Sequence, residues 1–547
     1  MADDTKAGDD TSIKPPSYPI IYVRGYAFSE GEVEDTVSDP YMGFNLGSTK
    51  IRTVWTGATE RYYFESPLIR LMKDFDYRDV YTAGLDYAAL EKMPPGRMAS
   101  KSIIIYRYYD RVSKVFGEGK QVSMEDFAIG LGELIEKIRD RICGDDPKER
   151  SSFKVYLVGH SMGGLVIRTF LQNDKIGKKQ TKALVDKVFT YATPHNGIDF
   201  GLVGNVPSFV RFNSLDNFNR DRMRAYLGLS PDARKLDDVG TLDGKFSADK
   251  FFCLVGTNYR DYLVANGLSS TAAGEFSDGL VRMSNAIVYE TMDKTKTPRK
   301  KLAPRAYIHR SHSGYFGIVN SEEGFQNLTR FLFGDVKVDG VLEISDLRLP
   351  DELEQIRKEG KKEIRASYHF ECIARVRGVH WDLSRRVAPE NSSIFRTYAE
   401  LFPKAKVEKD ERAIARKHHD TPELFTAYLL TDPKYRADPT REELGFTVDL
   451  SVLVPDYTVD GFAFLKDHFP GGHIFRDKIN LETRPDPTGG ADWTLRYGFD
   501  SETPNQIKYD APITKDERSV SFKVPIVKKG NPGIDANMIL TATWWNR

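Results

Sequence analysis

The sequence predicts an α/β domain followed by an all-β, sandwich-like domain. From Pro19 to about Gly334, short apolar runs alternate with amphipathic helical stretches, which is typical of a mostly parallel sheet flanked by helices. After Gly334, apolar and polar residues alternate with a period of two between Pro, Gly and Asp turns. This change of pattern predicts domains 19–334 and 335–547, preceded by a disordered leader, 1–18.

The α/β part contains a series of short apolar runs that predict buried strands. They are Ile20–Arg24, Asp79–Ala83, Ile103–Tyr108, Val155–Val158, Lys187–Tyr191, Phe251–Val255 and Arg305–Ile308. Helical spacing of apolar residues predicts helices at Phe127–Ile142 and Gly324–Phe333, and Leu165–Leu171 continues a helix directly out of a strand. A long segment, 198–250, interrupts this order.

The all-β part contains a second series of strands and one interruption. The predicted strands are Val336–Ile344, Tyr368–Val376, Phe446–Leu453, Ile474–Leu481, Trp493–Phe499, Val520–Val527 and Met538–Trp545. The charged stretch Lys404–Leu429 is expected to be a helical insertion. These strands predict an antiparallel sandwich or barrel that follows the α/β domain in the sequence.

Composition excludes several classes of protein. The 547 residues carry 79 basic and 79 acidic side chains, whereas a nucleic-acid-binding protein normally has a basic surplus, so no nucleic-acid partner is expected. No apolar run approaches the roughly 18 residues that cross a bilayer, and the polar, acidic start shows no signal peptide. The 3 cysteines cannot form a disulfide framework. A cytoplasmic location is therefore predicted.

One segment carries the strongest chemical signal. An apolar run leads into Gly159-His160-Ser161-Met162-Gly163 and then into an apolar helix start. A strand that enters a helix through so short a turn needs small residues on both sides of a strained nucleophile. The N–H of Met162 would lie at the positive end of this helix, where it can stabilise a developing oxyanion. The pattern predicts Ser161 as a nucleophile; the alternative is a glycine-rich turn whose serine has no function.

Three further motifs follow the serine motif along the chain. They are Tyr191-Ala192-Thr193-Pro194-His195-Asn196-Gly197, Ser277-Asp278-Gly279-Leu280-Val281 and Tyr307-Ile308-His309-Arg310-Ser311-His312. In this order the motifs resemble the α/β-hydrolase superfamily, and more narrowly its bacterial lipase and esterase branch, over residues 19–333. The resemblance implies an α/β-hydrolase fold, a helical cap or lid at 198–250, and catalytic residues in the order serine, acid, histidine.

Several histidines compete for the role of general base. Catalytic residues of open α/β sheets lie in loops beyond the carboxyl ends of strands, which favours His312 over His309, because the strand is still running at His309. The side chain of His160 is expected to point away from the site, and His195 is expected to be structural. We therefore predict His312 as the base, with His309 as the alternative.

The base needs an acid to fix its tautomer. Asp278 lies in a loop-like stretch beyond the predicted strand Phe251–Val255, as a catalytic acid should. The alternative is that this aspartate only caps the turn at Gly279. Glu275 is the nearest substitute, and the weaker candidates are Asp186 and Asp199.

The second oxyanion donor is expected after the first strand. Ile20–Tyr26 resembles the oxyanion loop of the superfamily, and the N–H of Tyr26 would donate beside that of Met162. Arg24 stands where the superfamily usually has histidine. It either brings a cation near the substrate or is an ordinary surface arginine.

These residues together predict a serine carboxylic-ester hydrolase, an esterase or lipase, that acts on a hydrophobic ester. Ser161, His312 and Asp278 would form the catalytic triad, and an acyl-enzyme would be the intermediate. One alternative is a phospholipase or acyltransferase whose C-terminal domain binds a membrane or an acceptor. The other is a catalytically inactive binding scaffold. The oligomeric state is not indicated.

No cofactor and no metal are expected. His418-His419-Asp420 and His380-Trp381-Asp382 lack the spacing of a metal-ligand set. Trp544-Trp545 fits either contact of the C-terminal domain with a lipid or polymer surface or a strand packed on a core.

Overall fold

The computed structural model describes most of the chain as two compact units. One unit contains Met1–Arg305 and Arg310–Leu328, and the other contains Ala306–His309 and Thr329–Arg547. The described residues are 15–25, 48–53, 59–80, 87–106, 123–198, 218–261, 276–292, 300–314, 316–359, 364–377, 379, 381–401, 421–436, 438–460, 466–486, 488 and 490–546. The predicted boundary at 334/335 stays a prediction.

Six strands of a central sheet lie in the N-terminal unit, and with β11 the described strands of this sheet run in the order β11-β8-β7-β6-β1-β5-β4. Every neighbouring pair from β8 to β4 is parallel. The strands are β1 (Ile20–Val23), β4 (Arg78–Asp79), β5 (Ser102–Tyr106), β6 (Val155–His160), β7 (Val185–Tyr191), β8 (Phe251–Gly256) and β11 (Arg305–Ile308). Six of them coincide with predicted runs, and β4 shares only Asp79 with the predicted run Asp79–Ala83, so the α/β prediction is confirmed. Parallel strands buried on both faces read as continuous apolar runs, which is why the sequence reveals them.

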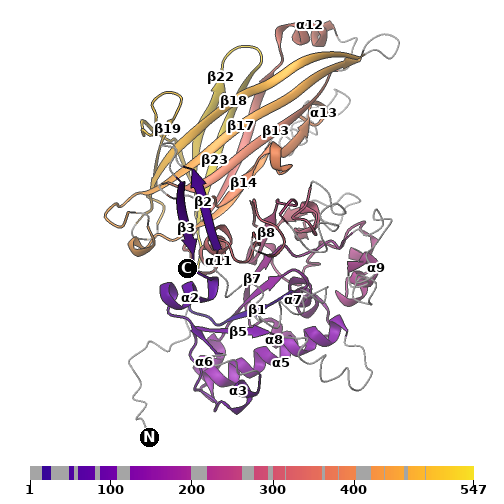
Figure 1. Ribbon diagram of the computed structural model, residues 1–547, viewed down its shortest axis with the longest axis vertical. Coiled ribbons are helices and arrows are strands. Elements are labelled where there is room, and N and C mark those ends of the chain that lie inside the picture. The colour runs from indigo at the N-terminus through magenta and orange to yellow at the C-terminus, as the bar shows by residue number, and fades with distance from the viewer. Residues whose placement is uncertain are drawn as a thin grey trace. The chain divides into compact units, whose positions relative to one another are not determined.

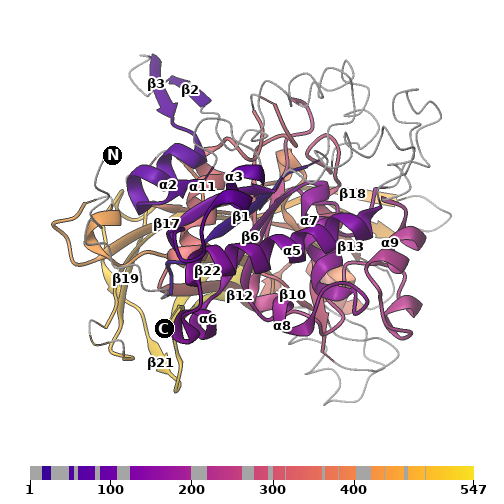
Figure 2. The same ribbon diagram turned by 90° about the horizontal axis from the view of Figure 1, so that it is seen from below.

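Helices pack on this sheet through their apolar residues. α5 (Met124–Cys143) begins with a capping box between Ser123 and Asp126, and its buried positions recur at helical spacing. α7 (Met162–Gln172) is buried along its whole length. Figures 1 and 2 show α5 and α7 side by side, and α7 also contacts β1 and β6. These contacts hold the helix that begins behind Ser161 against the sheet.

The unit contains further described helices and strands. The helices are α2 (Pro67–Phe75), α3 (Tyr87–Lys92), α6 (Pro147–Ser152), α8 (Lys179–Lys182), α9 (Arg220–Tyr226) and α11 (Glu322–Phe333), the last of which extends into the second unit. Two antiparallel pairs complete it: β2 (Ser48–Thr53) with β3 (Thr59–Phe64), and β9 (Tyr289–Thr291) with β10 (Lys300–Leu302). Within the predicted cap, 198–250, helix α9 is present and 199–217 lie outside the described residues.

The start of the chain differs from the predicted leader at one residue. Residues 1–14 lie outside the described part. Tyr18 is buried, and its ring packs edge-on against Tyr156 with the centroids 5.4 Å apart. Tyr18 therefore packs against β6, and the leader predicted for the residues before it stays a prediction.

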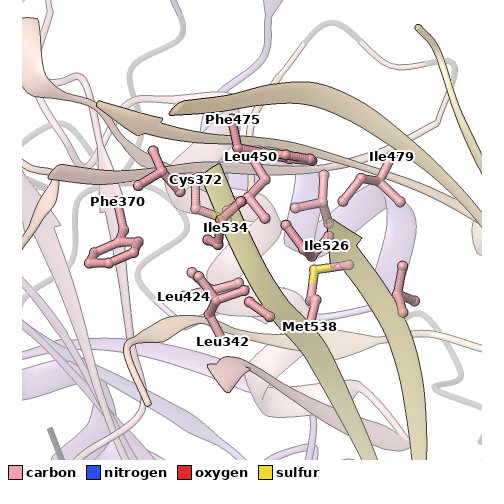
Figure 3. Packing of buried hydrophobic residues seen from close by; sticks show 14 of the residues in the cluster. Leu342, Phe370, Cys372, Leu424, Leu450, Phe475, Ile479, Ile526, Ile534 and Met538 are labelled. Carbon is pink, nitrogen blue, oxygen red and sulfur yellow. The ribbon is translucent and has the colours of Figure 1, made fainter. Parts of the chain in front are cut away.

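The C-terminal unit is built from two antiparallel sheets. The described strands of one run in the order β16-β12-β23-β22-β21, and those of the other in the order β14-β13-β17-β18-β19-β20, with β15 paired to β13. Figure 1 shows β13, β17 and β18 as long neighbouring strands. Residues of both sheets share one hydrophobic core, which includes Leu342, Phe370, Leu450 and Met538 (Figure 3). A shared core between two antiparallel sheets is a sandwich, as predicted.

Each of the predicted strands overlaps a strand of this unit, but β17 and β18 are more than twice as long as predicted, and β14, β15, β20 and β21 were not predicted. The described elements are β12 (Val336–Arg348), α12 (Asp351–Glu359), β13 (Ile364–Val376), β14 (Ser384–Arg386), β15 (Ile394–Thr397), α13 (Tyr398–Leu401), β16 (Glu423–Leu429), β17 (Leu444–Asp460), β18 (Lys466–Arg484), β19 (Thr494–Phe499), β20 (Tyr509–Asp510), β21 (Ile513–Lys515), β22 (Ser519–Lys528) and β23 (Gly533–Trp544). The helical prediction for Lys404–Leu429 is wrong at its end, because Glu423–Leu429 pairs with β12 as a strand. Residues 402–420 lie outside the described part.

The tryptophan pair at the end of β23 is packed against other residues of the same unit. The indole N–H of Trp544 donates to the Gly490 carbonyl at 3.0 Å, and its ring lies 5.1 Å from that of Trp493. Trp545 donates to the Phe331 carbonyl at 2.9 Å. Of the two interpretations of this pair, packing on the core accounts for these contacts.

Candidate active site

Ser161 lies in a strained turn between β6 and α7. Its backbone has φ 52° and ψ −126°, a conformation that non-glycine residues rarely adopt. A Cβ on Gly163 would lie 2.0 Å from the Val23 carbonyl oxygen, and one on Gly164 would lie 2.2 Å from Thr193 Oγ1. Only glycine fits at these two positions, so the spacing of glycines in the sequence is what allows the tight turn.

Three of the predicted residues form one chain of hydrogen bonds. His312 Nε2 lies 3.0 Å from Ser161 Oγ, and His312 Nδ1 lies 2.9 Å from Asp278 Oδ2. All three residues are buried. The imidazole therefore lies between the Ser161 hydroxyl and the Asp278 carboxylate, at the distances that proton transfer requires. The three side chains come from three separate loops.

The carboxylate of Asp278 is held by its own loop. Oδ1 accepts the N–H groups of Leu280 at 3.0 Å and Val281 at 2.7 Å, which leaves Oδ2 for His312. The main chain of His312 is joined to the same residue, because its N–H donates to the Asp278 carbonyl at 3.0 Å. Asp278 thus caps the turn after it through Oδ1 and faces His312 through Oδ2, while the Gly279 N–H donates to Ser277 Oγ.

The other candidate bases have different partners. His309 is half exposed, and its Nδ1 lies 3.4 Å from Glu390 Oε2. His195 is fully buried, with Nε2 3.1 Å from Thr190 Oγ1. The structure therefore places His312, and neither of these two, against Ser161 Oγ.

The substitute acids do not reach the histidine either. Asp186 Oδ1 accepts a hydrogen bond from Lys250 at 2.6 Å. Asp199 and Glu275 lie outside the described residues.

The side chain of His160 contradicts the expectation that it points away from the site. Its Nε2 lies 3.0 Å from the carbonyl oxygen of His312, and the two rings are 5.2 Å apart. Burial and, second, the nearby His312 lower the pKa of His160 to about 3. Nothing in the serine motif itself could have revealed this contact, because it joins residues 152 positions apart.

The loop after β1 lies against the nucleophile, as the resemblance implied. A Cβ on Gly25 would lie 3.1 Å from Ser161 Cβ and 3.1 Å from His160 Nδ1. Arg24 is buried, so the interpretation as a surface arginine is wrong. Met162 is the first residue of α7, where amide groups have no acceptor inside the helix. Tyr26 lies outside the described residues, and the oxyanion role of both amides stays a prediction.

The described residues contain no group of three or more His, Cys, Asp or Glu side chains arranged to hold a metal ion. His380 and His418–Asp420 lie outside the described part of the chain. No helix within the described ranges is long and apolar enough to cross a bilayer.

The parallel sheet, the strained serine between β6 and α7, and the flanking helices define the class of this unit. The N-terminal unit has an α/β-hydrolase fold. Residues 117–288 match the family described as "PGAP1-like alpha/beta domain".

Several solved structures are similar to this chain at low sequence identity. The lin2722 gene product of Listeria innocua is 14% identical with a TM-score of 0.24, and the match covers 58% of this chain and 93% of that one. A putative cell surface hydrolase from Lactobacillus plantarum is 13% identical with a TM-score of 0.24, covering 62% of this chain and 97% of that one. The lipase BlEst2 of Bacillus licheniformis, in its propeptide form, is 9% identical with a TM-score of 0.28, covering 95% and 96%. Among curated protein sequences, none matches this chain.

Proposed function

We propose that this protein is a serine hydrolase that cleaves carboxylic esters through an acyl-enzyme. The hydrogen-bonded series Ser161–His312–Asp278 is the observation that carries the proposal. A binding scaffold has no need of a serine hydroxyl aligned with an imidazole and a buried carboxylate.

In the proposed reaction, Ser161 Oγ attacks the ester carbonyl while His312 Nε2 takes the hydroxyl proton. Asp278 stabilises the imidazolium that results, through its Nδ1–H. His312 then gives the proton to the leaving alcohol, and the acyl group stays on Ser161. Water, deprotonated by His312, attacks the acyl-enzyme, and His312 then returns this proton to Ser161 Oγ as the acid leaves. The amides of Met162 and Tyr26 are the proposed donors to the oxyanion in both halves of the reaction.

Exposed aromatic residues next to the triad favour a hydrophobic ester as substrate. Phe276 is 61% exposed two residues before Asp278, and Phe316 is 50% exposed four residues after His312. Their backbones are fixed, since the Phe276 carbonyl accepts from Met283 and the Phe316 carbonyl accepts from Ser311. Apolar surface on the two loops that hold acid and base suits an apolar acid or alcohol group.

A fluorophosphonate probe together with a panel of p-nitrophenyl esters tests the proposal. The wild-type protein is expected to be labelled at one site and to hydrolyse the esters, and Ser161→Ala is expected to lose both properties with an unchanged melting temperature. Ser313→Ala, in the loop next to His312, is the matched control and should still be labelled. A folded wild-type protein that neither reacts with the probe nor hydrolyses any ester would contradict the proposal and favour a binding scaffold.

A further inference from the structure

His160 is a buried histidine to which the proposed reaction assigns no role. It immediately precedes Ser161, and its ring reaches the main chain of His312, with Nε2 3.0 Å from the carbonyl oxygen. The side chain therefore connects the strand that carries the nucleophile with the loop that carries the base.

The chemistry of this contact fixes the state of the ring. A carbonyl oxygen can only accept, so Nε2 of His160 must carry the hydrogen and donate it. Nδ1 is buried and has no hydrogen-bond partner among the described residues, which agrees with a lone pair at that position. Burial lowers the pKa of His160 to about 3, so the ring is neutral throughout the pH range in which an esterase works.

The contact completes the restraint on the main chain of His312. The N–H of His312 donates to the Asp278 carbonyl at 3.0 Å, and its C=O accepts from His160 at 3.0 Å. The N–H of His312 is thus held by Asp278, a member of the proposed triad. Its C=O is held by His160, the neighbour of Ser161. A shift of this main chain would carry the imidazole away from Ser161 Oγ.

We propose that His160 is a positioning residue, which holds the main chain of His312 and thereby sets the distance from its Nε2 to Ser161 Oγ. The inference rests on the proposed function, since it assigns His312 as the base. His160 touches no reacting atom in this role. A misplacement of about 1 Å can lower a rate about 100-fold, so loss of the restraint is expected to lower kcat by about 10- to 100-fold.

The test compares side chains that keep or remove the donor. His160→Gln places an amide N–H near the position of Nε2 and is expected to retain most of kcat. His160→Leu removes the donor and is expected to show the full loss in kcat with little change in KM, because substrate binding does not use the contact. His160→Asn, whose amide is one bond shorter, is expected to lie between the two and guards against failure of the leucine variant to fold.

His195→Leu is the matched control, because His195 is equally buried in the same unit but contacts Thr190 instead of His312. It is expected to lower the melting temperature while keeping kcat per folded molecule. Rates of fluorophosphonate labelling should follow kcat across the series.

Two adverse outcomes are distinguishable. If the wild-type protein hydrolyses esters and both His160→Leu and His160→Asn retain its kcat, the positioning role is overturned and the proposed function stands. If the wild-type protein neither hydrolyses esters nor reacts with the probe, the proposed function fails, and the positioning role fails with it.

Discussion

The Asp278→Asn variant tests the proposed triad most sharply, because the structure determines how the new side chain must point. In the wild-type protein Oδ1 accepts two amide N–H groups, from Leu280 and Val281, and Oδ2 faces His312 Nδ1. In the variant only the carbonyl oxygen of the asparagine can accept those two amides. Its NH2 group is therefore turned toward His312.

The energies decide which orientation of the asparagine side chain is populated. Rotating the amide by 180° would break both hydrogen bonds and bring its NH2 group against the two backbone N–H groups. This costs about 3 kcal/mol, so the rotated form stays below about 1% of the population. With the NH2 group against Nδ1, His312 must keep its hydrogen on Nε2, where it faces Ser161 Oγ. The base then has no lone pair for the serine proton. Forcing this wrong tautomer on a serine triad lowers kcat by about 10⁴-fold, which corresponds to about 5 kcal/mol of transition-state stabilisation.

The assay is kcat for a p-nitrophenyl ester, corrected for the folded fraction by circular dichroism. Asp278→Asn is expected to be at least as inactive as Asp278→Ala, since alanine removes the acid without selecting the wrong tautomer. Asp186→Asn, which changes a carboxylate paired with Lys250, is the control and should keep wild-type kcat. A value for Asp278→Asn within about tenfold of the wild type would refute the reasoning and exclude Asp278 as the acid.

Two further predictions concern stability and substrate range. Burial lowers the pKa of Lys187 from 10.5 to about 7. Between these pH values the unfolded chain binds a proton that the folded protein lacks, so the free energy of unfolding falls as the pH falls toward 7. Lys187→Met is expected to stabilise the protein at pH 7.5 by on the order of 4 kcal/mol and to flatten the pH dependence of the free energy of unfolding in urea. Lys179→Met, on the surface, is the control and should do neither. An unchanged slope of the free energy of unfolding against pH in Lys187→Met would contradict this prediction. The double variant Phe276→Ser, Phe316→Ser is expected to lower kcat/KM about tenfold for long-chain esters and little for acetate esters, because apolar contact is worth about 0.8 kcal/mol per methylene group. Phe395→Ser is the exposed control for the pair, and an equal loss for all chain lengths would count against a hydrophobic acyl site.

Sequence reasoning predicts the local parts of this fold well. The strands of the central sheet are recognisable because both of their faces are buried, and the turn at Ser161 is recognisable because its glycines occupy positions where no Cβ fits. The strand β16 (Glu423–Leu429) was expected to be part of a helix. Its charged neighbourhood resembles a solvated helix, and only the pairing with β12 determines its conformation.

The candidate site was predictable only in part, for a different reason. The order and loop positions of Ser161, Asp278 and His312 are visible in the sequence. The contacts that orient them depend on main-chain groups: the amides of Leu280 and Val281, and the carbonyl of His312. Every residue has such groups, so no residue type signals them. The burial of Arg24 was missed as well, because charged residues are seldom fully buried and nothing nearby in the sequence marks an exception.

The double connection between Asp278 and His312 has a consequence for variation of this chain. The two residues are 34 positions apart in the sequence. A side-chain and a main-chain hydrogen bond join them, and so hold together the two ends of the chain excursion that lies between them. Changes of chain length between the paired strands β9 and β10 are therefore expected to leave acid and base in place, because this pairing and the two hydrogen bonds hold the ends of the excursion and the entropy of closure depends only weakly on length.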